Sequence, residues 1–153
     1  MNDYITITME YKICPYADLY NAKLRNAKLR NADLRYVDLR VADLSGADLR
    51  NANLTYAKLR NADLTNADLI GADLRYAKLE NAYLTSADLT SADLTNVNLY
   101  NAKLINANLR DADLRYADLY NADLYYTKID KKWYEYIKNQ NMRGFNKIIW
   151  VGE

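Results

Sequence analysis

The sequence predicts an all-β solenoid, a rod in which short, similar units stack on one another along one axis. Leucine falls at every fifth position from Leu19 to Leu124, which gives 22 leucines without a miss. Alanine stands two positions before almost every one of them, with Val37 and Val97 as the exceptions. Tyrosines in the slot two positions after leucine recur at multiples of twenty residues. These three periodicities indicate the fold class and the number of sides of the rod.

A period of five residues fits neither regular element. Five residues advance about 140° around an α-helix, so successive leucines would point in all directions. In a continuous β-strand the side chains alternate, so an odd step would place successive leucines on opposite faces. Only a chain that turns by the same angle after every unit keeps all leucines inside. Alanine then shares the inward face with leucine, and the Asn- and Gly-rich slot two positions after leucine forms a corner.

The spacing of the corner tyrosines predicts four sides. Twenty residues per coil correspond to four five-residue units, and Asn96 fills the one gap in the tyrosine column. A second column, in which arginine alternates with threonine, lies one position earlier in the chain. The tyrosines are Tyr36, Tyr56, Tyr76 and Tyr116, with Tyr126 outside the column. The second column is Arg35, Thr55, Arg75, Thr95 and Arg115.

These units resemble a known family. Ala-Asp-Leu-Arg-Asn at 47–51 and Ala-Asp-Leu-Thr-Asn at 62–66 are similar to the A-(D/N)-L-x-x motif of the pentapeptide-repeat proteins. The resemblance covers residues 17–131 and implies a right-handed quadrilateral β-helix of about 5.5 coils, each made of four pentapeptides. In the slot before leucine the sequence departs from the motif, which we expect to change the surface charge and not the fold. The departures are Lys23, Lys28, Lys58, Lys78, Lys103 and Tyr83.

The N-terminal end is expected to be covered by a strand. Residues 4–14 alternate apolar and polar side chains, a pattern typical of a half-buried strand. We therefore assign an N-terminal cap to residues 1–16. The β-helix proper follows at 17–131.

The C-terminal end is expected to carry a helix and a strand. The composition changes abruptly after the repeats, and Asp130 is placed to cap a short helix that ends at 142–144. Residues 145–151 predict a strand or an apolar strap, so a C-terminal cap is assigned to 132–153.

Two roles stay open for this C-terminal segment. It covers the open end of the solenoid, where unpaired strand edges invite aggregation, or it packs against its own copy in a symmetric homodimer. The resemblance makes the second role reasonable, because some pentapeptide-repeat proteins that act on gyrase dimerise through their C-terminal ends. The candidate contacts for either role are Trp133, Tyr134, Ile137, Phe145, Ile149 and Trp150.

The composition argues against catalysis. The chain has no histidine, so the usual proton shuttle and the commonest metal ligand are both missing. Its one cysteine, Cys14, cannot form a disulfide within the chain and is expected to be a small buried hydrophobe. Aspartates should stack in two columns, one of Asp48, Asp68 and Asp88 and one of Asp73, Asp93 and Asp113. We expect them to be solvated carboxylates beside arginine and lysine, because a convex rod offers no cleft. We therefore expect no enzyme, no cofactor and no metal site.

Charge and hydropathy limit the kinds of partner and the cellular location that we expect for this chain. The chain carries 21 basic and 20 acidic residues, for a net charge of +1, without the basic excess of a nucleic-acid binder. Direct nucleic-acid binding is therefore not expected. The sequence shows neither a signal-peptide pattern nor an apolar stretch long enough to span a membrane, so we expect a cytoplasmic protein with no membrane partner.

The tyrosine and arginine columns form the candidate partner surface, since aromatic and arginine residues commonly anchor interfaces. The alternative is that the tyrosines only stack on each other and stiffen one edge. The charge is also uneven along the rod: residues 17–60 carry nine basic and five acidic side chains, and residues 61–100 carry two and six. A partner of complementary polarity could recognise this difference. The candidate surface consists of Tyr36, Tyr56, Tyr76, Tyr116, Arg35, Arg75 and Arg115.

The function predicted from these features is a non-catalytic protein-interaction or scaffold module whose partner is another protein. The alternative is mimicry of duplex DNA to bind a topoisomerase such as gyrase, which the resemblance to quinolone-resistance pentapeptide-repeat proteins suggests. Charge arithmetic disfavours it. A DNA segment of about 26 Å carries roughly fifteen negative charges, whereas residues 17–131 hold sixteen acidic and sixteen basic groups.

Overall fold

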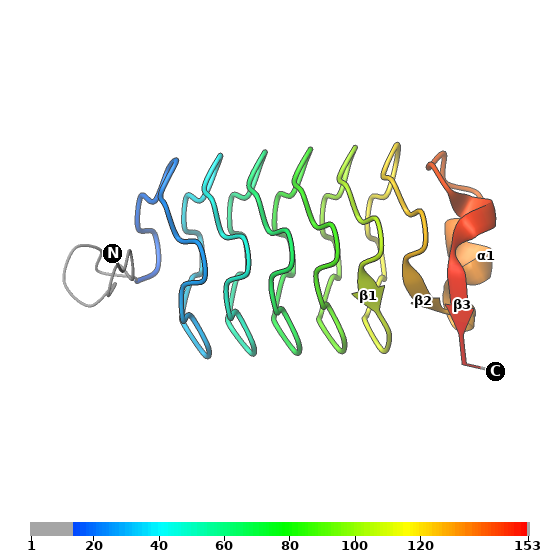
Figure 1. Cartoon of the computed structure of the whole chain (residues 1–153), viewed down its shortest axis with the longest axis horizontal. Helices are drawn as coiled ribbons and strands as arrows, with labels where there is room; N and C mark the ends of the chain where they lie inside the picture. Colours follow the sequence, from blue (N-terminus) through cyan, green and yellow to red (C-terminus); the bar gives the residue numbers. More distant parts are fainter. Residues whose placement is uncertain (1–13, 153) are drawn as a thin grey trace, which may run out of the picture.

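The chain winds into a rod of stacked coils, seen from the side in Figure 1. The computed structural model describes residues 14–152. Parallel β-bridges join Asp18 to Asp38 and Asp38 to Lys58, so the chain returns to the same column after twenty residues, as the tyrosine spacing predicts. We number the coils from residue 17, so that the first is 17–36 and the fifth is 97–116.

Each coil has four sides of five residues. In the first coil they are the first side (17–21), the second side (22–26), the third side (27–31) and the fourth side (32–36). The residue before leucine makes the bridge to the neighbouring coil, and the two residues after leucine form the turn. In most units of the described chain only this one residue makes a β-bridge, because little of each unit is extended. β1 (Asn108–Leu109) is a place where two consecutive residues pair and form a short strand.

The corners are tight turns with one residue in the left-handed region. The Ala22 N–H donates to the Leu19 carbonyl at 3.0 Å, which closes a four-residue turn. Its third residue, Asn21, has a φ of 56°, and this positive φ recurs at every corner. A type II turn needs φ > 0 at that place, and glycine and asparagine supply it at least cost. The same slot also holds tyrosine, serine and valine, such as Val41 at 63°.

Leucine and alanine fill the interior. Ala52, Leu54, Ala57 and Leu59 are all completely buried, and the same holds with small deviations along the whole rod. Each buried leucine contributes about 1.5–3 kcal/mol relative to an exposed one. Since the core is continuous and each coil contacts only its neighbours, stability accumulates coil by coil.

Backbone hydrogen bonds join the coils in a regular ladder. On the second side the Leu24 N–H donates to the Asp43 carbonyl at 2.7 Å, and the Asp43 N–H donates to Ala22 at 2.9 Å. At the corner the Asn26 N–H donates to Ser45 at 2.9 Å. Three bonds per side leave few backbone groups unpaired inside the stack.

The C-terminal segment lies across the last coil. It consists of β2 (Lys128–Asp130), η1 (Lys131–Trp133), α1 (Tyr134–Ile137), η2 (Phe145–Lys147) and β3 (Ile149–Val151). β2 pairs with β1 and with β3, both in parallel, so β3 adds one more step to the ladder. Figure 1 shows α1 and β3 together at this end of the rod.

A helix and a strand are both present, but the strand covers only Ile149–Val151 of the expected 145–151, because Phe145–Lys147 form η2. Two further details of the prediction are wrong. The helix ends at Ile137 and not at 142–144, because the chain must turn back so that Arg143 can pair with Asp123 in the ladder. The Asp130 side chain makes no helix cap. Its Oδ2 instead accepts the Asp111 N–H at 2.9 Å, which satisfies a backbone donor of the preceding coil.

Side chains of this segment also bond to exposed backbone of the last coils. Trp133 Nε1 donates to the Ala112 carbonyl at 3.1 Å, and the Tyr136 hydroxyl donates to Ala117 at 3.0 Å. The Gln140 side chain accepts the Leu119 N–H at 2.8 Å. Inside the stack, the corresponding backbone groups are paired with the next coil, so these side chains replace the coil that is missing at the end of the ladder.

The N-terminal strand expected at 4–14 falls outside the described residues, apart from Cys14. Cys14 occupies the leucine slot one unit before Leu19, and its carbonyl accepts the turn hydrogen bond from Ala17 at 3.1 Å. The thiol side chain is half-buried and not buried as expected. Cys14 is the first residue that the structure describes.

Candidate protein-interaction surface

The tyrosine column is a continuous stack of four rings. Tyr16, Tyr36, Tyr56 and Tyr76 have successive ring centroids 4.8, 4.9 and 4.8 Å apart, with interplanar angles of 2–6°. The spacing equals the distance between neighbouring strands, because each ring projects from the same corner of successive coils. Sequence reasoning missed Tyr16, although it lies twenty residues before Tyr36 in the same corner slot.

Tyr116 belongs to the same column but stands apart from the stack. Asn96 occupies the corner between Tyr76 and Tyr116 and interrupts the ring contacts. Tyr116 is 73% exposed, against 40% for Tyr36 inside the stack. Within residues 14–152 no other ring stacks on it. The column therefore presents a rigid strip of rings and one separate, open ring.

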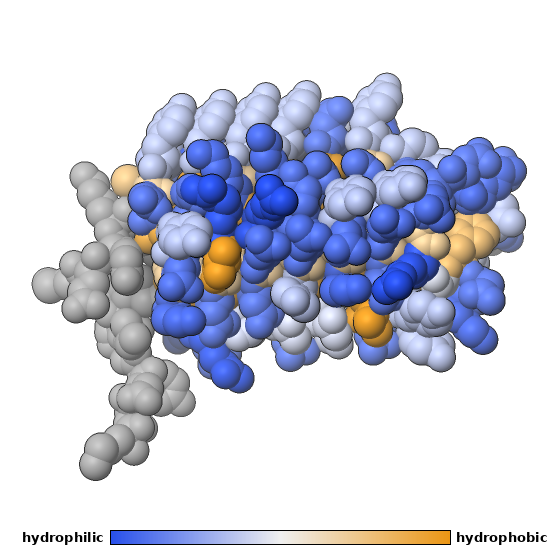
Figure 2. Space-filling model, turned by 90° about the horizontal axis from the view of Figure 1, so that it is seen from above, coloured by the Kyte–Doolittle hydropathy of each residue, from blue (hydrophilic) through white to orange (hydrophobic). Residues whose placement is uncertain are grey.

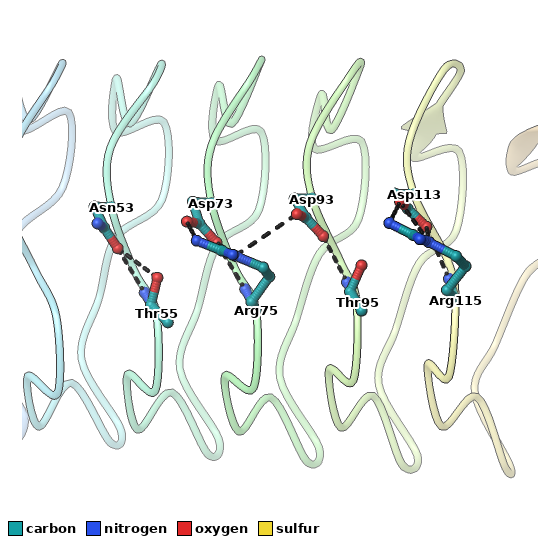
Figure 3. Close-up of polar contacts among 8 residues, drawn as sticks. All are labelled: Asn53, Thr55, Asp73, Arg75, Asp93, Thr95, Asp113 and Arg115. Carbon is teal, nitrogen blue, oxygen red and sulfur yellow. Dashed lines mark hydrogen bonds and ion pairs between the residues drawn. The ribbon is translucent and has the colours of Figure 1, made fainter.

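The arginines of the second column are paired and are not free cations. Arg75 Nε and Nη2 lie 2.8 and 2.6 Å from the two carboxylate oxygens of Asp73. Arg35 binds Asp33 in the same two-pronged way, at 2.8 and 2.7 Å. Figure 3 shows two such pairs, Asp73 with Arg75 and Asp113 with Arg115, and the contact of Arg75 with Asp93 in the next coil.

This pairing changes the acidity of the carboxylates. The hydrogen bonds from Arg35 lower the pKa of Asp33, and those from Arg115 lower the pKa of Asp113. The side is thus a set of neutral ion pairs rather than a positive stripe.

The slot before leucine has a second role that the sequence did not reveal. The Asp93 carboxylate accepts the N–H of Thr95, two residues later, at 2.9 Å. Asn53 accepts both the N–H of Thr55 at 3.1 Å and its hydroxyl at 2.5 Å. Aspartate and asparagine therefore support the corner as local side-chain caps, in addition to setting the surface charge. The frequent Asp-Leu-x and Asn-Leu-x triplets are the signal that could have indicated it.

The aspartate columns stack as expected but are partly neutralised. On the third side Asp48 bridges to Asp68 and Asp68 to Asp88 along the rod. Arg50 contacts both of the first two, at 2.6 Å to Asp48 and 3.3 Å to Asp68. Among residues 14–152 no group of three or more histidine, cysteine, aspartate or glutamate side chains is arranged to hold a metal ion.

The candidate C-terminal residues divide between the core and the surface. Ile137 is fully buried, and Trp133, Phe145 and Trp150 pack partly buried against the core. Tyr134 and Ile149 are 41% and 43% exposed. The rings of Tyr134, Phe145 and Trp150 form one cluster with centroids 5.2–5.8 Å apart.

The outer surface is hydrophilic over most of the face in Figure 2, with apolar side chains present singly. Exposed aliphatic side chains of the rod include Val41 and Ile70, at 42% and 36% exposure. In the part of the chain that the structure describes, no helix is long and apolar enough to cross a membrane.

A four-cornered ladder with a twenty-residue period and a core of stacked leucine and alanine defines a quadrilateral β-helix, a class of solenoid repeat protein. A family profile described as pentapeptide repeats matches the chain in eight copies, which lie within residues 16–51, 32–69, 52–91, 67–103 and 92–125. The chain belongs to this family, whose members fold as right-handed quadrilateral β-helices, and the resemblance drawn from the motif is confirmed.

Several solved structures are similar to this chain. The pentapeptide repeat protein alr5209 from Nostoc PCC 7120 is 33% identical, with a TM-score of 0.53 over 71% of this chain and 84% of that protein. HetL, from Nostoc sp. strain PCC 7120 and involved in heterocyst differentiation regulation, is 33% identical with a TM-score of 0.43. The match covers 73% of this chain but only 61% of the length of HetL. A thylakoid-lumen member from Arabidopsis thaliana is 30% identical over 65% of this chain and 73% of its own length, with a TM-score of 0.40. No protein with a curated description matches this chain.

Proposed function

We propose that this chain is a non-catalytic protein-interaction module, and that the tyrosine column with its flanking arginines contacts a protein partner. The observation that carries the proposal is the stack of Tyr16, Tyr36, Tyr56 and Tyr76, whose rings are parallel within 6° and yet 40% or more exposed. Side chains already held in place lose little conformational entropy when a partner binds. The stack is therefore pre-organised for binding as well as for stiffness.

The chemistry beside the rings suits a mixed interface. The stacked faces are occupied, so the ring edges and hydroxyl groups of the column remain for a partner. Arg75 and Arg115 lie next to the rings, and each is already neutralised by its own aspartate. Such a surface buries aromatic area without the cost of desolvating free charges, which fits a neutral, partly polar protein surface. Tyr116 supplies an additional open ring at the end of the column.

Site-specific photo-crosslinking tests the proposal. A photoreactive phenylalanine is placed at Tyr56, and the matched control carries it at Asn66, which occupies the same corner slot with a φ of 58° on a different corner. In lysate of the source organism we expect one reproducible protein adduct from position 56 and none from position 66. Equal adducts from both positions would mean that the tyrosine column has no special role in binding.

In this proposal the C-terminal segment serves as a cap. What supports it is the way Trp133, Tyr136 and Gln140 bond to backbone groups of the last coils. A homodimer through the same segment remains the alternative, supported by the exposure of Tyr134 and Ile149. Truncation of the segment distinguishes the two roles.

Mimicry of DNA toward a topoisomerase is the second candidate function, and the charge pattern weighs against it. Five aspartates are each held by the arginine two residues later. Residues 17–131 as a whole hold sixteen acidic and sixteen basic groups, so the rod has no net negative charge to imitate that of a duplex. A supercoiling assay with gyrase that is unaffected by an excess of the protein would remove this candidate.

A further inference from the structure

Arginines in the slot after leucine differ in the residue that precedes the leucine of their unit. Where aspartate precedes the leucine, the arginine binds that aspartate; this holds for Arg35, Arg40, Arg50, Arg75 and Arg115. Where lysine precedes the leucine, the guanidinium has no partner in its own unit. Two such units, Lys23-Leu24-Arg25 and Lys28-Leu29-Arg30, follow one another directly.

These two units form a basic corner, which we define as Lys23, Arg25, Lys28 and Arg30. They lie on the second and third sides of the first coil, on either side of the turn at Asn26, near the blue end of Figure 1. All four side chains are exposed. Among residues 14–152 none of them forms an ion pair, in contrast to the five arginines that follow aspartate.

The acidic residues nearest along the rod are already engaged. Asp43 and Asp48 bridge in the ladder to Lys23 and Lys28. Asp43, however, accepts the N–H and the hydroxyl of Ser45, at 3.1 and 2.6 Å. Asp48 is held by Arg50. Within residues 14–152, therefore, neither carboxylate hydrogen-bonds to the basic corner, and its donors are available to a ligand.

The charge beyond the basic corner limits what can bind there. On the same two sides the next three coils carry an acidic run with one cation, Arg50. Its acidic members are Asp43, Asp48, Asp63, Asp68 and Asp88. A long polyanion lying along the rod would meet like charge after a single coil, which spans only about 4.8 Å. A short anionic element that crosses the rod at the first coil meets four cations and avoids the acidic run.

We propose that the basic corner binds a short acidic segment of a partner protein, one with two to four clustered aspartate or glutamate side chains. Guanidinium groups recognise carboxylates through two parallel hydrogen bonds, and no carboxylate of the described part of the chain forms such a pair with Arg25 or Arg30. The basic corner lies on other sides of the rod than the tyrosine column. It is therefore a second contact area, and the proposal for it does not depend on partner binding by the tyrosine column.

Fluorescence anisotropy with a labelled peptide of eight alternating aspartate and glutamate residues tests this. The experimental variant is Arg25→Gln with Arg30→Gln, and the matched control is Arg35→Gln with Arg40→Gln. Both variants change the net charge by the same amount, in the same slot of the repeat. We expect the first to weaken peptide binding at least about fivefold and the control less than about twofold, since each exposed ion pair contributes only modestly. Circular dichroism confirms that both variants stay folded.

Two outcomes would overturn the proposal. If both variants weaken binding equally, the peptide responds to net charge and not to the basic corner. The proposal also fails if a 20-base-pair DNA duplex binds more tightly than the peptide and its affinity depends more steeply on salt. A salt dependence steeper than the release of about four counterions, one for each cation of the basic corner, would mean that the ligand is a nucleic acid bound over a larger surface. Lys23→Gln with Lys28→Gln provides a further check, because it removes charge but leaves both guanidinium groups in place. It should weaken binding less than the arginine variant.

Discussion

Arg50 holds the Asp48 carboxylate through two hydrogen bonds, with Nε 2.8 Å from Oδ1 and Nη2 2.6 Å from Oδ2. The same guanidinium also lies 3.3 Å from Asp68 in the next coil. One arginine thus closes a pair within its own unit and connects two coils. A five-residue repeat makes this possible, because it places the slots before and after leucine side by side on one face, and the same slots of the next coil directly beside them.

This pair gives the stability a defined dependence on pH. The hydrogen bonds from Arg50 lower the pKa of Asp48 to about 2, below its value of about 3.9 in an unfolded chain. A lowered pKa in the folded state means that the stabilisation is complete above about pH 5 and is lost as the pH falls through about 2. The pKa of Asp38 is lowered in the same way by Arg40, so the effect adds over several pairs. Urea unfolding at pH 7, 5.5 and 2.5 should show a nearly constant free energy of unfolding at the first two and a decrease at the third.

Arg50→Gln isolates the contribution of this pair. The variant should be slightly less stable at pH 7, by less than about 1 kcal/mol because the pair is partly exposed, and it should lose less on acidification than the unaltered chain. Identical pH dependence in the two proteins would show that the Asp48–Arg50 pair does not contribute to acid stability.

Truncation of two adjacent residues, Leu69 and Ile70, should have very different effects on the free energy of unfolding. Leu69 is completely buried, whereas Ile70 is 36% exposed. Leu69→Ala should lower the free energy of unfolding by about 2–5 kcal/mol, through lost burial and the cavity left between coils. Ile70→Ala removes a similar aliphatic side chain from the surface and should cost less than about 1 kcal/mol. Equal losses in denaturant titrations would contradict the assignment of the inward and outward faces.

The corners predict a preference for asparagine over alanine. Gly71 has a φ of 66°, and a Cβ placed there would lie 2.5 Å from Asn51 Oδ1. Gly71→Ala should therefore destabilise by about 1–2 kcal/mol, from backbone strain and a close contact. Gly71→Asn introduces the same Cβ but a residue that tolerates the left-handed region. It can also form the amide-to-amide bond that Asn101 makes to Asn81 at 2.7 Å. Thermal unfolding should place Gly71→Asn above Gly71→Ala, and the reverse order would refute the strain argument.

Much of this fold could be predicted because it follows from backbone geometry. The unbroken leucine period determined the inward face, and the tyrosines at Tyr36, Tyr56 and Tyr76 determined the twenty-residue coil. The inward face and the coil length depend only on the direction in which each residue points. A uniform repeat fixes that direction without knowledge of side-chain conformation.

The features that escaped prediction depend on side-chain conformation and on the end of the stack. Whether Arg75 is free or bound to Asp73 depends on the rotamers of two side chains that the repeat places on the same surface. The early end of α1 at Ile137 depends on the space available over the last coil. The tyrosine and arginine columns therefore lie where the repeat places them, but the pairing of their charges could be described only from the structure.

Truncation after Lys131 tests the role of the C-terminal segment. The shortened chain loses Ile137 and Ile148 from the core, together with the bonds that Trp133, Tyr136 and Gln140 make to the last coils. It also loses β3, so β2 becomes an open edge with unpaired backbone groups. If the segment is a cap, light scattering should show aggregation of the truncated chain, and circular dichroism should show partial unfolding. If the intact chain is a dimer and the truncated chain is a folded monomer, the segment is an interface, because a cap cannot be removed without exposing the ladder.

Gln140→Ala provides the finer control for this test. The variant removes only the bonds to Leu119 and Ala117, and should destabilise a cap by about 1–3 kcal/mol without changing the mass in solution.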